Sequence, residues 1–264
     1  IGTVCVLSRL RAKCPDCRAY TAVALGPEYE CHACGRTFAA GLVRVPRAWG
    51  RHGDPMAQAA ALPLPYPEAA VIEEDTLAEQ SLALALELPE RPLVLGGCCC
   101  AHIGAVEALA ARHERVAVVW LDAHGDLNTV ESSPSGNEWA TPLRLLLDSG
   151  AVEPDDVVLV GVRNLDPPEV EFISANGIGV GGDAVDEALD GTAGAYVAVD
   201  FDSLSEDEVA PFMPEPGGLS LAEAEDVLVG VRDRTPVLGV GLTAMLPDER
   251  NLGPAKRLTA ALGL

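Results

Sequence analysis

Short runs of apolar, β-branched residues alternate with helical patterns from residue 42 to the C-terminus. The runs are continuously apolar rather than alternating, which is typical of strands buried on both faces of a parallel sheet. Strand–helix alternation places such a sheet between two helical layers. The predicted strands are Leu42–Pro46, Ala69–Glu73, Pro92–Leu95, Val116–Leu121, Val157–Gly161, Ile178–Val180, Tyr196–Val199 and Val237–Gly241.

The helices predicted between these strands carry recognisable start and stop signals. Ser220 and Glu223 form a capping box, Gly150 follows one helix, and Asn176-Gly177 follows another. The predicted helices are Asp75–Leu88, Ile103–His113, Thr141–Asp148, Pro167–Ala175, Ser220–Arg232 and Pro254–Leu262. The sequence therefore predicts a three-layer α/β/α domain with an eight-stranded, mostly parallel sheet over residues 41–264.

Two of the predicted strands end in alternating acidic and histidine residues. Asp122, His124 and Asp126 follow one strand, and Asp200 and Asp202 follow another. Residues i, i+2 and i+4 of an extended segment point the same way, and ligands bind beyond the carboxyl ends of parallel strands. Because these carboxylates would repel one another, we expect two divalent cations between them, although such acids can also cap helices or lie on solvated turns.

A third strand runs into a turn that holds three consecutive cysteines, Cys98 to Cys100, followed by His102. This is the third strand end that carries polar groups where the ligands of a parallel sheet bind.

The N-terminal segment carries two C-x-x-C pairs, which predict a structural Zn²⁺ site in a zinc ribbon over residues 1–40. A redox C-x-x-C is the alternative. The intervening residues predict a hairpin that turns at Gly26-Pro27, and a segment this short needs the metal to fold. The predicted ligands are Cys14, Cys17, Cys31 and Cys34.

The charge distribution restricts the classes of partner. The net charge of −22 argues against general nucleic-acid binding. Residues 1–53, the basic head, nevertheless carry a net charge of +5, whereas the remaining residues, the acidic body, carry −27. We favour docking of the head on the body or on a neighbouring subunit. The alternative is a separate anionic partner for the head. No apolar run is long enough to span a bilayer, and the N-terminal IGTVCVL is too short for a signal peptide. The first residue is Ile1, so the chain could be clipped; we expect a cytoplasmic protein.

Several of these motifs resemble the arginase and agmatinase (ureohydrolase) family. LDAHGD (121–126) and VDFDSL (199–204) are similar to the family's Asp-Ala-His-x-Asp and Asp-x-Asp segments, and three further stretches, SGN (135–137), GVRNLDPPE (161–169) and PEPGGLS (214–220), are also similar. The resemblance runs from Leu42 to the C-terminus. It implies an arginase-like fold, two metal ions that are usually Mn²⁺, attack of a metal-bridging hydroxide on an sp² carbon, and a homo-oligomer.

The first departure from the family pattern concerns a metal ligand. The family's turn has a ligand His where this chain has Cys99, and a thiolate there would favour Zn²⁺ over harder ions such as Mn²⁺. Alternatively His102 completes the first cation site, or that site is missing.

Two further departures concern the substrate. The family's proton-shuttling His aligns with Trp139, and its guanidinium-pairing acid falls near Thr243, and neither replacement can perform the original role. The residues that resemble the family's clamp on an α-amino-acid head group are retained: Asn128, Ser135 and Asn137 for the carboxylate, and Asp166 for the amino group.

The resulting prediction is a metal-dependent hydrolase of a linear C–N bond in an amidine, guanidine, ureido or amide group of a small, amino-acid-like molecule other than arginine. Asp126 and His124 are the predicted catalytic residues, and Asp126 would also accept a proton. The alternative is a non-catalytic or regulatory relative that binds metals for structure and uses its pocket or ribbon for binding.

Overall fold

The computed structural model describes residues 10–264, so the expectations about IGTVCVL, and the positions of Cys5 and Arg9, lie outside the described residues. It contains an eight-stranded sheet in the order β10-β9-β8-β11-β12-β7-β5-β6, with every neighbouring pair parallel. The strands are β5 (Gly41–Val45), β6 (Glu68–Val71), β7 (Pro92–Gly96), β8 (Val116–Leu121), β9 (Val157–Val160), β10 (Gly179–Val180), β11 (Gly194–Asp200) and β12 (Val237–Thr243). The predicted fold class is confirmed, and each predicted strand overlaps an observed one.

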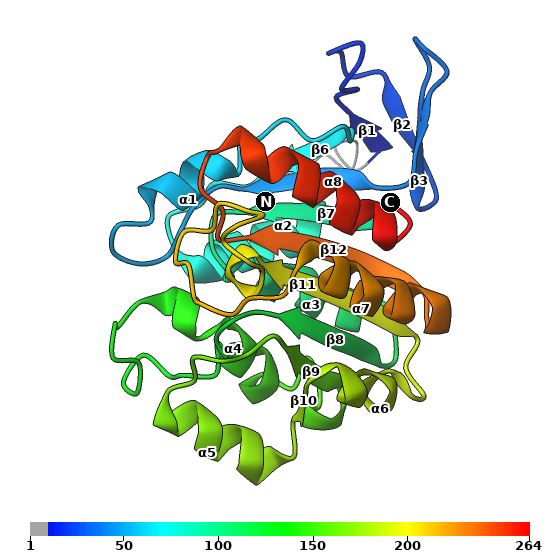
Figure 1. The fold of residues 1–264 in the computed structure, drawn as a ribbon. Coiled ribbons are helices and arrows are strands. Elements are labelled where there is room, and N and C mark those ends of the chain that lie inside the picture. Colours follow the sequence, from blue (N-terminus) through cyan, green and yellow to red (C-terminus); the bar gives the residue numbers. More distant parts are fainter. Residues whose placement is uncertain (1–9) are drawn as a thin grey trace.

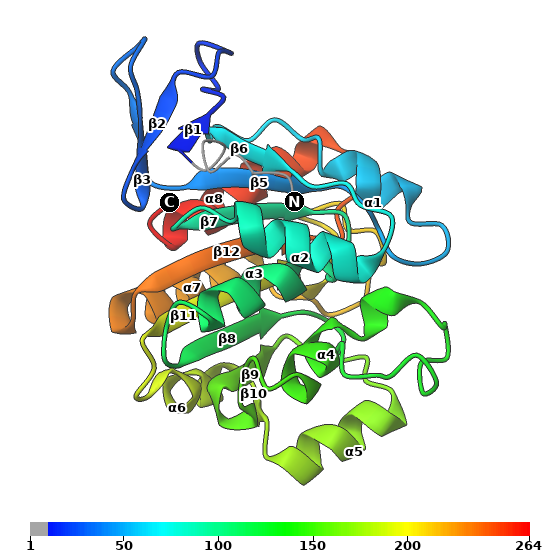
Figure 2. The ribbon, with the colours of Figure 1, turned by 180° about the vertical axis from the view of Figure 1, so that it is seen from behind.

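Helices cover both faces of this sheet. α7 (Leu221–Arg234) and α8 (Leu252–Ala261) lie over the face turned toward the viewer in Figure 1, with the short α6 (Val185–Leu189) beside them. α2 (Leu77–Glu87), α3 (Ala101–Ala110) and α4 (Pro142–Asp148) cover the opposite face, which Figure 2 shows, and α5 (Pro167–Asn176) lies toward the β10 edge. All six predicted helices are present, whereas α1 (Asp54–Ala59) and α6 were not predicted because each is shorter than two helical turns.

The two faces of the sheet bury separate cores, as a period of two requires. In β8, Ala117, Val119 and Leu121 pack with α6, α7 and α8. Their neighbours Val116, Val118 and Trp120 pack with α2, α3 and α4. This explains the continuous apolar runs in the sequence, because neither face of a central strand meets water.

A small antiparallel sheet precedes the large one, in the order β1-β2-β3-β4. Its strands are β1 (Arg11–Ala12), β2 (Ala22–Leu25), β3 (Glu28–Cys31) and β4 (Thr37–Phe38). β2 and β3 form the predicted hairpin, and Gly26 at its turn has the positive φ of 66° that favours glycine. β4 ends two residues before the predicted domain boundary at residue 40, and β5 begins just after it.

The small sheet docks on the edge of the large one. Lys13 and Glu68 exchange backbone hydrogen bonds of 2.8 and 2.9 Å, which joins the end of β1 to β6. The ring of Tyr29 packs against Gly41 so closely that a Cβ at Gly41 would lie 2.7 Å from it. The small sheet therefore contacts the large sheet through backbone hydrogen bonds and packing, while a separate anionic partner for the basic head stays a prediction. Among residues 10–264, no helix is long and apolar enough to cross a membrane.

Candidate metal centre

The candidate site lies at the carboxyl ends of four adjacent strands, β8, β11, β12 and β7. Asp122 follows β8, Asp200 ends β11 opposite Thr243 of β12, and the cysteine turn follows β7. Parallel strands bring segments that are far apart in the sequence to one edge. The structure thus brings together the three strand ends that the sequence singled out.

One group of donors comprises Asp122, His124 and Asp202, whose candidate ligand atoms all lie within 4.8 Å of one another. His124 Nδ1 lies 3.1 Å from Asp202 Oδ2 and 3.4 Å from Asp122 Oδ1. The second oxygen of Asp202 accepts a hydrogen bond from the backbone N–H of Ala123. These contacts fix the three side chains around one point.

A second group comprises Cys99, Asp122 and Asp126, also within 4.8 Å. The Cys99 thiol donates to Asp200 Oδ2 at 2.9 Å, so Asp200 adjoins this group as well. Asp122 belongs to both groups, and its Oδ2 accepts from Trp120 Nε1 at 3.1 Å. Two donor groups that share a carboxylate suit a pair of cations with a bridging ligand.

Asp126 is the residue that indicates most directly that the cluster fits a cation. Its Oδ2 is buried and has no hydrogen-bond partner within residues 10–264, and its backbone has a φ of 53°, which is uncommon for a residue other than glycine. Buried polar atoms are nearly always paired, and strained backbone persists where the surroundings impose it. A cation beside Asp126 would satisfy this oxygen, so the residues present fit a metal site.

The cluster gathers several buried acids around His124. Burial, and then the neighbouring Asp202, raise the pKa of Asp122 to about 7. Burial and nearby carboxylates raise the pKa values of Asp126 and Asp200 well above their usual range. Burial lowers the pKa of His124, but the carboxylates of Asp122 and Asp202 outweigh it and raise that pKa to about 12. For Asp202, burial raises the pKa, but the neighbouring His124 outweighs it, so the pKa of Asp202 is lowered. Divalent cations would reverse this balance by stabilising the ionised carboxylates.

His102 is buried behind the cluster and is not among the donor groups within residues 10–264. Its Nδ1 lies 2.9 Å from Tyr196 Oη and its Nε2 lies 3.2 Å from Thr243 Oγ1. Burial lowers the pKa of His102 to about 3, so the ring is neutral. Of the two candidates in the cysteine turn, the structure brings Cys99 to the carboxylates and engages both nitrogens of His102 elsewhere.

A cavity of about 220 Å³ opens above the cluster. The predicted clamp residues Asn128, Ser135, Asn137 and Asp166 all line it, together with Trp139. Asn128 Nδ2 donates to Asp166 Oδ2 at 2.9 Å, and Asn137 Oδ1 accepts from the backbone N–H of Arg51. The structure therefore gathers these residues around the same cavity that the candidate metal ligands line.

The structure differs from the sequence prediction at Thr243. This side chain is fully buried behind Cys99, with its Oγ1 3.3 Å from the sulfur, and Ala244 lines the cavity in its place. The backbone causes the difference, because Ala244 has a φ of 55° that turns it toward the cavity as β12 ends. Neither residue carries a charge, so the expectation of no acid at this position is unaffected.

Several wall residues were not identified from the sequence. Phe212 meets Trp139 edge-on, with ring centroids 6.0 Å apart, and Met56 and Met213 also line the cavity. Glu169 lines it too, but its carboxylate accepts from the backbone N–H groups of Leu127 and Asp166. Phe212 lies just before the PEPGGLS motif, so the position of that motif could have indicated that Phe212 is near the site. Met56 belongs to α1, which was not predicted, so no sequence feature indicated it.

The amino-acid sequence matches a known protein family over most of its length. Residues 55–263 match the family model described as "Arginase family". The chain belongs to the arginase family. An arginase from Bacillus caldovelox is 34% identical over 190 residues, which cover 61% of this chain and 63% of that protein. An arginase from Staphylococcus aureus strain COL is 36% identical over 118 residues, or 41% of this chain and 39% of that relative. The matched sequence thus spans less than two thirds of either curated relative.

Solved structures of arginase-family proteins share the fold. The Bacillus caldovelox arginase superposes with a TM-score of 0.70 and 26% identity, covering 84% of this chain and 97% of that one. A proclavaminate amidino hydrolase from Streptomyces clavuligerus gives a TM-score of 0.67 at 21% identity, with 84% and 89% coverage. A formimidoylglutamase from Bacillus subtilis gives 0.65 at 19%, with 84% of each chain covered. At these last two identities the likeness shows the fold alone.

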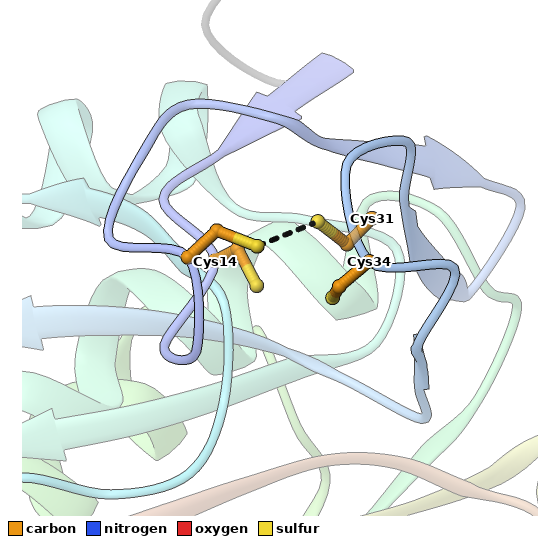
Figure 3. A group of neighbouring side chains, drawn as sticks. Cys14, Cys31 and Cys34 are labelled. Atoms are coloured by element: carbon orange, nitrogen blue, oxygen red, sulfur yellow. Dashed lines mark hydrogen bonds between the residues drawn. The ribbon is translucent and has the colours of Figure 1, made fainter.

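The cysteines of the small sheet form a separate donor group. The sulfurs of Cys14, Cys17, Cys31 and Cys34 lie within 4.8 Å of one another. Figure 3 shows Cys14 approaching Cys31 and Cys34 from the opposite loop. Neighbouring thiols and burial raise the pKa of Cys17 to about 12, whereas a hydrogen bond from Thr21 leads the effects that lower the pKa of Cys31 to about 6. Four converging sulfurs have the composition of a tetrahedral Zn²⁺ site.

Proposed function

We propose that this chain is a metal-dependent hydrolase of a linear C–N bond in an amidine, guanidine, ureido or amide group. The observation that carries the proposal is the pair of donor groups sharing Asp122 at the base of a cavity. Membership of the arginase family supports it. The substrate we propose is an amino-acid-like molecule other than arginine.

The proposed cation ligands are Asp122, His124, Asp200 and Asp202 for one ion, and Cys99, Asp122, Asp126 and Asp200 for the other. When bound there, divalent cations supply a water-derived nucleophile at neutral pH and polarise the group under attack. The protein supplies ligand positions set by strand ends, which are more rigid than loops.

The Asp126 carboxylate is the proposed proton acceptor of the site. Within residues 10–264 its Oδ2 is buried without a hydrogen-bond partner, so no hydrogen bond holds this carboxylate away from a cation or a proton in the site. Burial and the Asp122 carboxylate raise the pKa of Asp126 well above its usual value in the metal-free protein, and cations bound beside it would lower that pKa again, which would leave the carboxylate ionised and able to accept a proton. The same carboxyl can then deliver that proton to the departing nitrogen.

The cavity wall favours a substrate with two unlike ends. Asn128, Ser135, Asn137 and Asp166 offer polar groups to an α-amino-acid head. Trp139, Phe212 and Ala244 offer an apolar surface without a charge to pair with guanidinium. Because an unpaired buried charge is costly, the far end of the substrate is neutral or weakly basic. The named relatives, an arginase, an amidino hydrolase and a formimidoylglutamase, differ in substrate on one fold.

The test is turnover by the full chain after removal of metals and reloading with Mn²⁺ or Zn²⁺. Ammonia and urea release would be measured on a panel of guanidines, amidines, ureido compounds and amides. Metal-dependent release from one class is the expected result. Equal activity after chelation would contradict the metal mechanism, and two bound cations without any turnover would identify a non-catalytic relative.

A further inference from the structure

The cysteine turn places one sulfur among carboxylates. Cys99 Sγ lies 2.9 Å from Asp200 Oδ2 and 4.0 Å from Asp122 Oδ2, and Cys99 is 4% exposed. The unpartnered Oδ2 of the buried Asp126 belongs to the same donor group. The other group, around His124, contains only nitrogen and oxygen donors. The two groups therefore differ in chemical softness.

A buried chain of hydrogen bonds ends on this sulfur. It runs from Tyr196 Oη to His102 Nδ1 at 2.9 Å, from His102 Nε2 to Thr243 Oγ1 at 3.2 Å, and from Thr243 Oγ1 to Cys99 Sγ at 3.3 Å. Tyr196, His102 and Thr243 are all fully buried. This chain of hydrogen bonds is thus buried away from solvent, and in such an interior each unmade hydrogen bond is costly.

The inventory of donors sets the direction of this chain. Within residues 10–264 the Tyr196 hydroxyl has His102 Nδ1 as its only hydrogen-bond partner, and a buried hydroxyl proton without an acceptor is costly, so we assign the hydroxyl as the donor to Nδ1. The neutral ring then carries its proton on Nε2 and donates to Thr243 Oγ1. The Thr243 hydroxyl consequently has its own proton available for Cys99 Sγ. The chain therefore presents a donor to the sulfur, which suits a thiolate.

Close packing holds the chain in place. A Cβ at Gly241 would lie 2.3 Å from both His102 Nδ1 and Tyr196 Oη, and a Cβ at Gly96 would lie 2.4 Å from that of Ala101. The edge of the His102 ring also meets Trp120, with centroids 5.0 Å apart. Because Gly241 has no side chain, the ring of His102 fits beneath the site, and from there His102 contacts Cys99 through Thr243.

We propose that Cys99 binds its cation as a thiolate, and that the pocket of Cys99, Asp122, Asp126 and Asp200 is consequently selective for Zn²⁺ over Mn²⁺. This inference rests on the two-cation site of the proposed function. Thiolate ligands favour borderline and soft ions, whereas carboxylate and imidazole donors in the His124 group accept harder ones. Thr243 and His102 are positioning residues that orient the sulfur and stabilise its negative charge. The thiol proton leaves to solvent as the cation binds.

The experiment uses Co²⁺ as the spectroscopic probe in the full chain. A cobalt–thiolate bond gives a near-ultraviolet charge-transfer band, which carboxylate and imidazole ligands do not give. The spectrum of Cys99→Ser is subtracted from that of the wild type, and any cobalt held by the ribbon cysteines cancels because they are unchanged. Cys100→Ser, which alters the same turn outside the donor groups, is the matched control.

The expected result is a band in the wild type and Cys100→Ser that is absent from Cys99→Ser. Zn²⁺ affinity at this site should fall in Cys99→Ser by more than the roughly 10–100-fold that loss of a supporting residue costs. Identical spectra of wild type and Cys99→Ser, with two cations bound at the strand ends and turnover intact, would overturn the thiolate assignment while leaving the proposed function standing. Absence of cations at the strand ends would overturn both.

Thr243 gives a second readout that a purely structural role would not change. Thr243→Val removes the donor to the sulfur, so the charge-transfer band should move to longer wavelength and Zn²⁺ affinity should fall by about 10-fold. Thr243→Ser keeps the hydroxyl and should restore both. An unchanged band in Thr243→Val would show that the hydrogen-bond chain does not act on the sulfur.

Discussion

The sulfur of Cys99, which follows β7, lies 2.9 Å from the Asp200 carboxylate at the end of β11. The two strands are separated in the sheet by β12, whose last residue, Thr243, touches the same sulfur at 3.3 Å. Residues from three strands thus meet around one thiol. This contact joins the cysteine turn after β7 to the acidic residues at the end of β11.

Replacement of Asp200 should separate function from stability. Asp200→Asn removes a proposed ligand of both cations, so turnover should fall at least about 100-fold, since cations contribute several kcal/mol to such reactions. The metal-free protein should become more stable, because one of several mutually repelling buried acids is gone. Asp207→Asn, which changes an exposed acid, is the control for both thermal unfolding and activity. Full activity in Asp200→Asn would exclude it as a ligand.

The metal-free protein should lose stability as pH rises from about 5 to 8. Burial raises the pKa of Asp122 to about 7, so in this window the native state binds more protons than the unfolded state, and the free energy of unfolding falls with pH. Although burial opposes the shift, the neighbouring acids raise the pKa of His124 to about 12. Above the pKa that His124 has in the unfolded chain, this residue therefore also makes the free energy of unfolding fall as pH rises. The lowered pKa of Asp202 acts only in more acidic solution.

This loss should be on the order of 3 kcal/mol, since each unit of pKa shift corresponds to about 1.4 kcal/mol. Urea unfolding across this pH range measures it. Saturating Zn²⁺ should reverse the slope, because cations compete with protons for the same ligands. A metal-free protein that gains stability toward pH 8 would contradict the described cluster.

The four sulfurs of the small sheet should hold one Zn²⁺ independently of the strand-end site. Cys14→Ser should lower the zinc content by about one ion per chain and make the N-terminal segment more sensitive to protease, because metal supplies folding energy to so small a unit. Cys100→Ser should leave that zinc in place. Unchanged zinc content and protease resistance in Cys14→Ser would refute the assignment.

Glycine 241 should be required for the packing around His102. Gly241→Ala places a Cβ 2.3 Å from two buried polar atoms, so the free energy of unfolding should fall by about 1–3 kcal/mol, the usual cost of overpacking. Gly253→Ala on α8 meets nothing within 4 Å and should be neutral or slightly stabilising. Equal effects of the two changes on chemical unfolding would contradict the described packing.

Substrate preference tests the cavity wall. Arginine, agmatine and the neutral-tailed citrulline should be compared at equal concentration with the Zn²⁺- and Mn²⁺-loaded chain. We expect the neutral tail to be preferred, because Trp139 and Ala244 offer no counter-charge. Efficient hydrolysis of arginine would refute this preference, as would a clear choice of agmatine, which lacks the carboxylate that the clamp grips.

The strands could be predicted from the sequence, and so could the grouping of the acids at one edge of the sheet, because both depend on local patterns. A continuous apolar run followed by alternating acids places Asp122 and Asp126 at a strand end whatever the neighbours are. The sequence did not distinguish Cys99 from His102, because the two lie about one helical turn apart across the start of α3, and the backbone there decides which side chain meets the acids. Nor did it place Ala244 in the cavity wall, which follows from a left-handed backbone at that residue. Met56 and Phe212 reach the cavity from an unpredicted short helix and a loop, which carry little periodic signal.

Anomalous scattering from crystals of the fully metal-loaded chain tests the central claim most directly. The account predicts one peak among Cys14, Cys17, Cys31 and Cys34, and two further peaks at the strand ends with Asp122 between them. The peak beside Cys99 should show the zinc absorption edge when Zn²⁺ and Mn²⁺ are supplied together. A single strand-end peak, or none, would contradict a two-cation hydrolytic site.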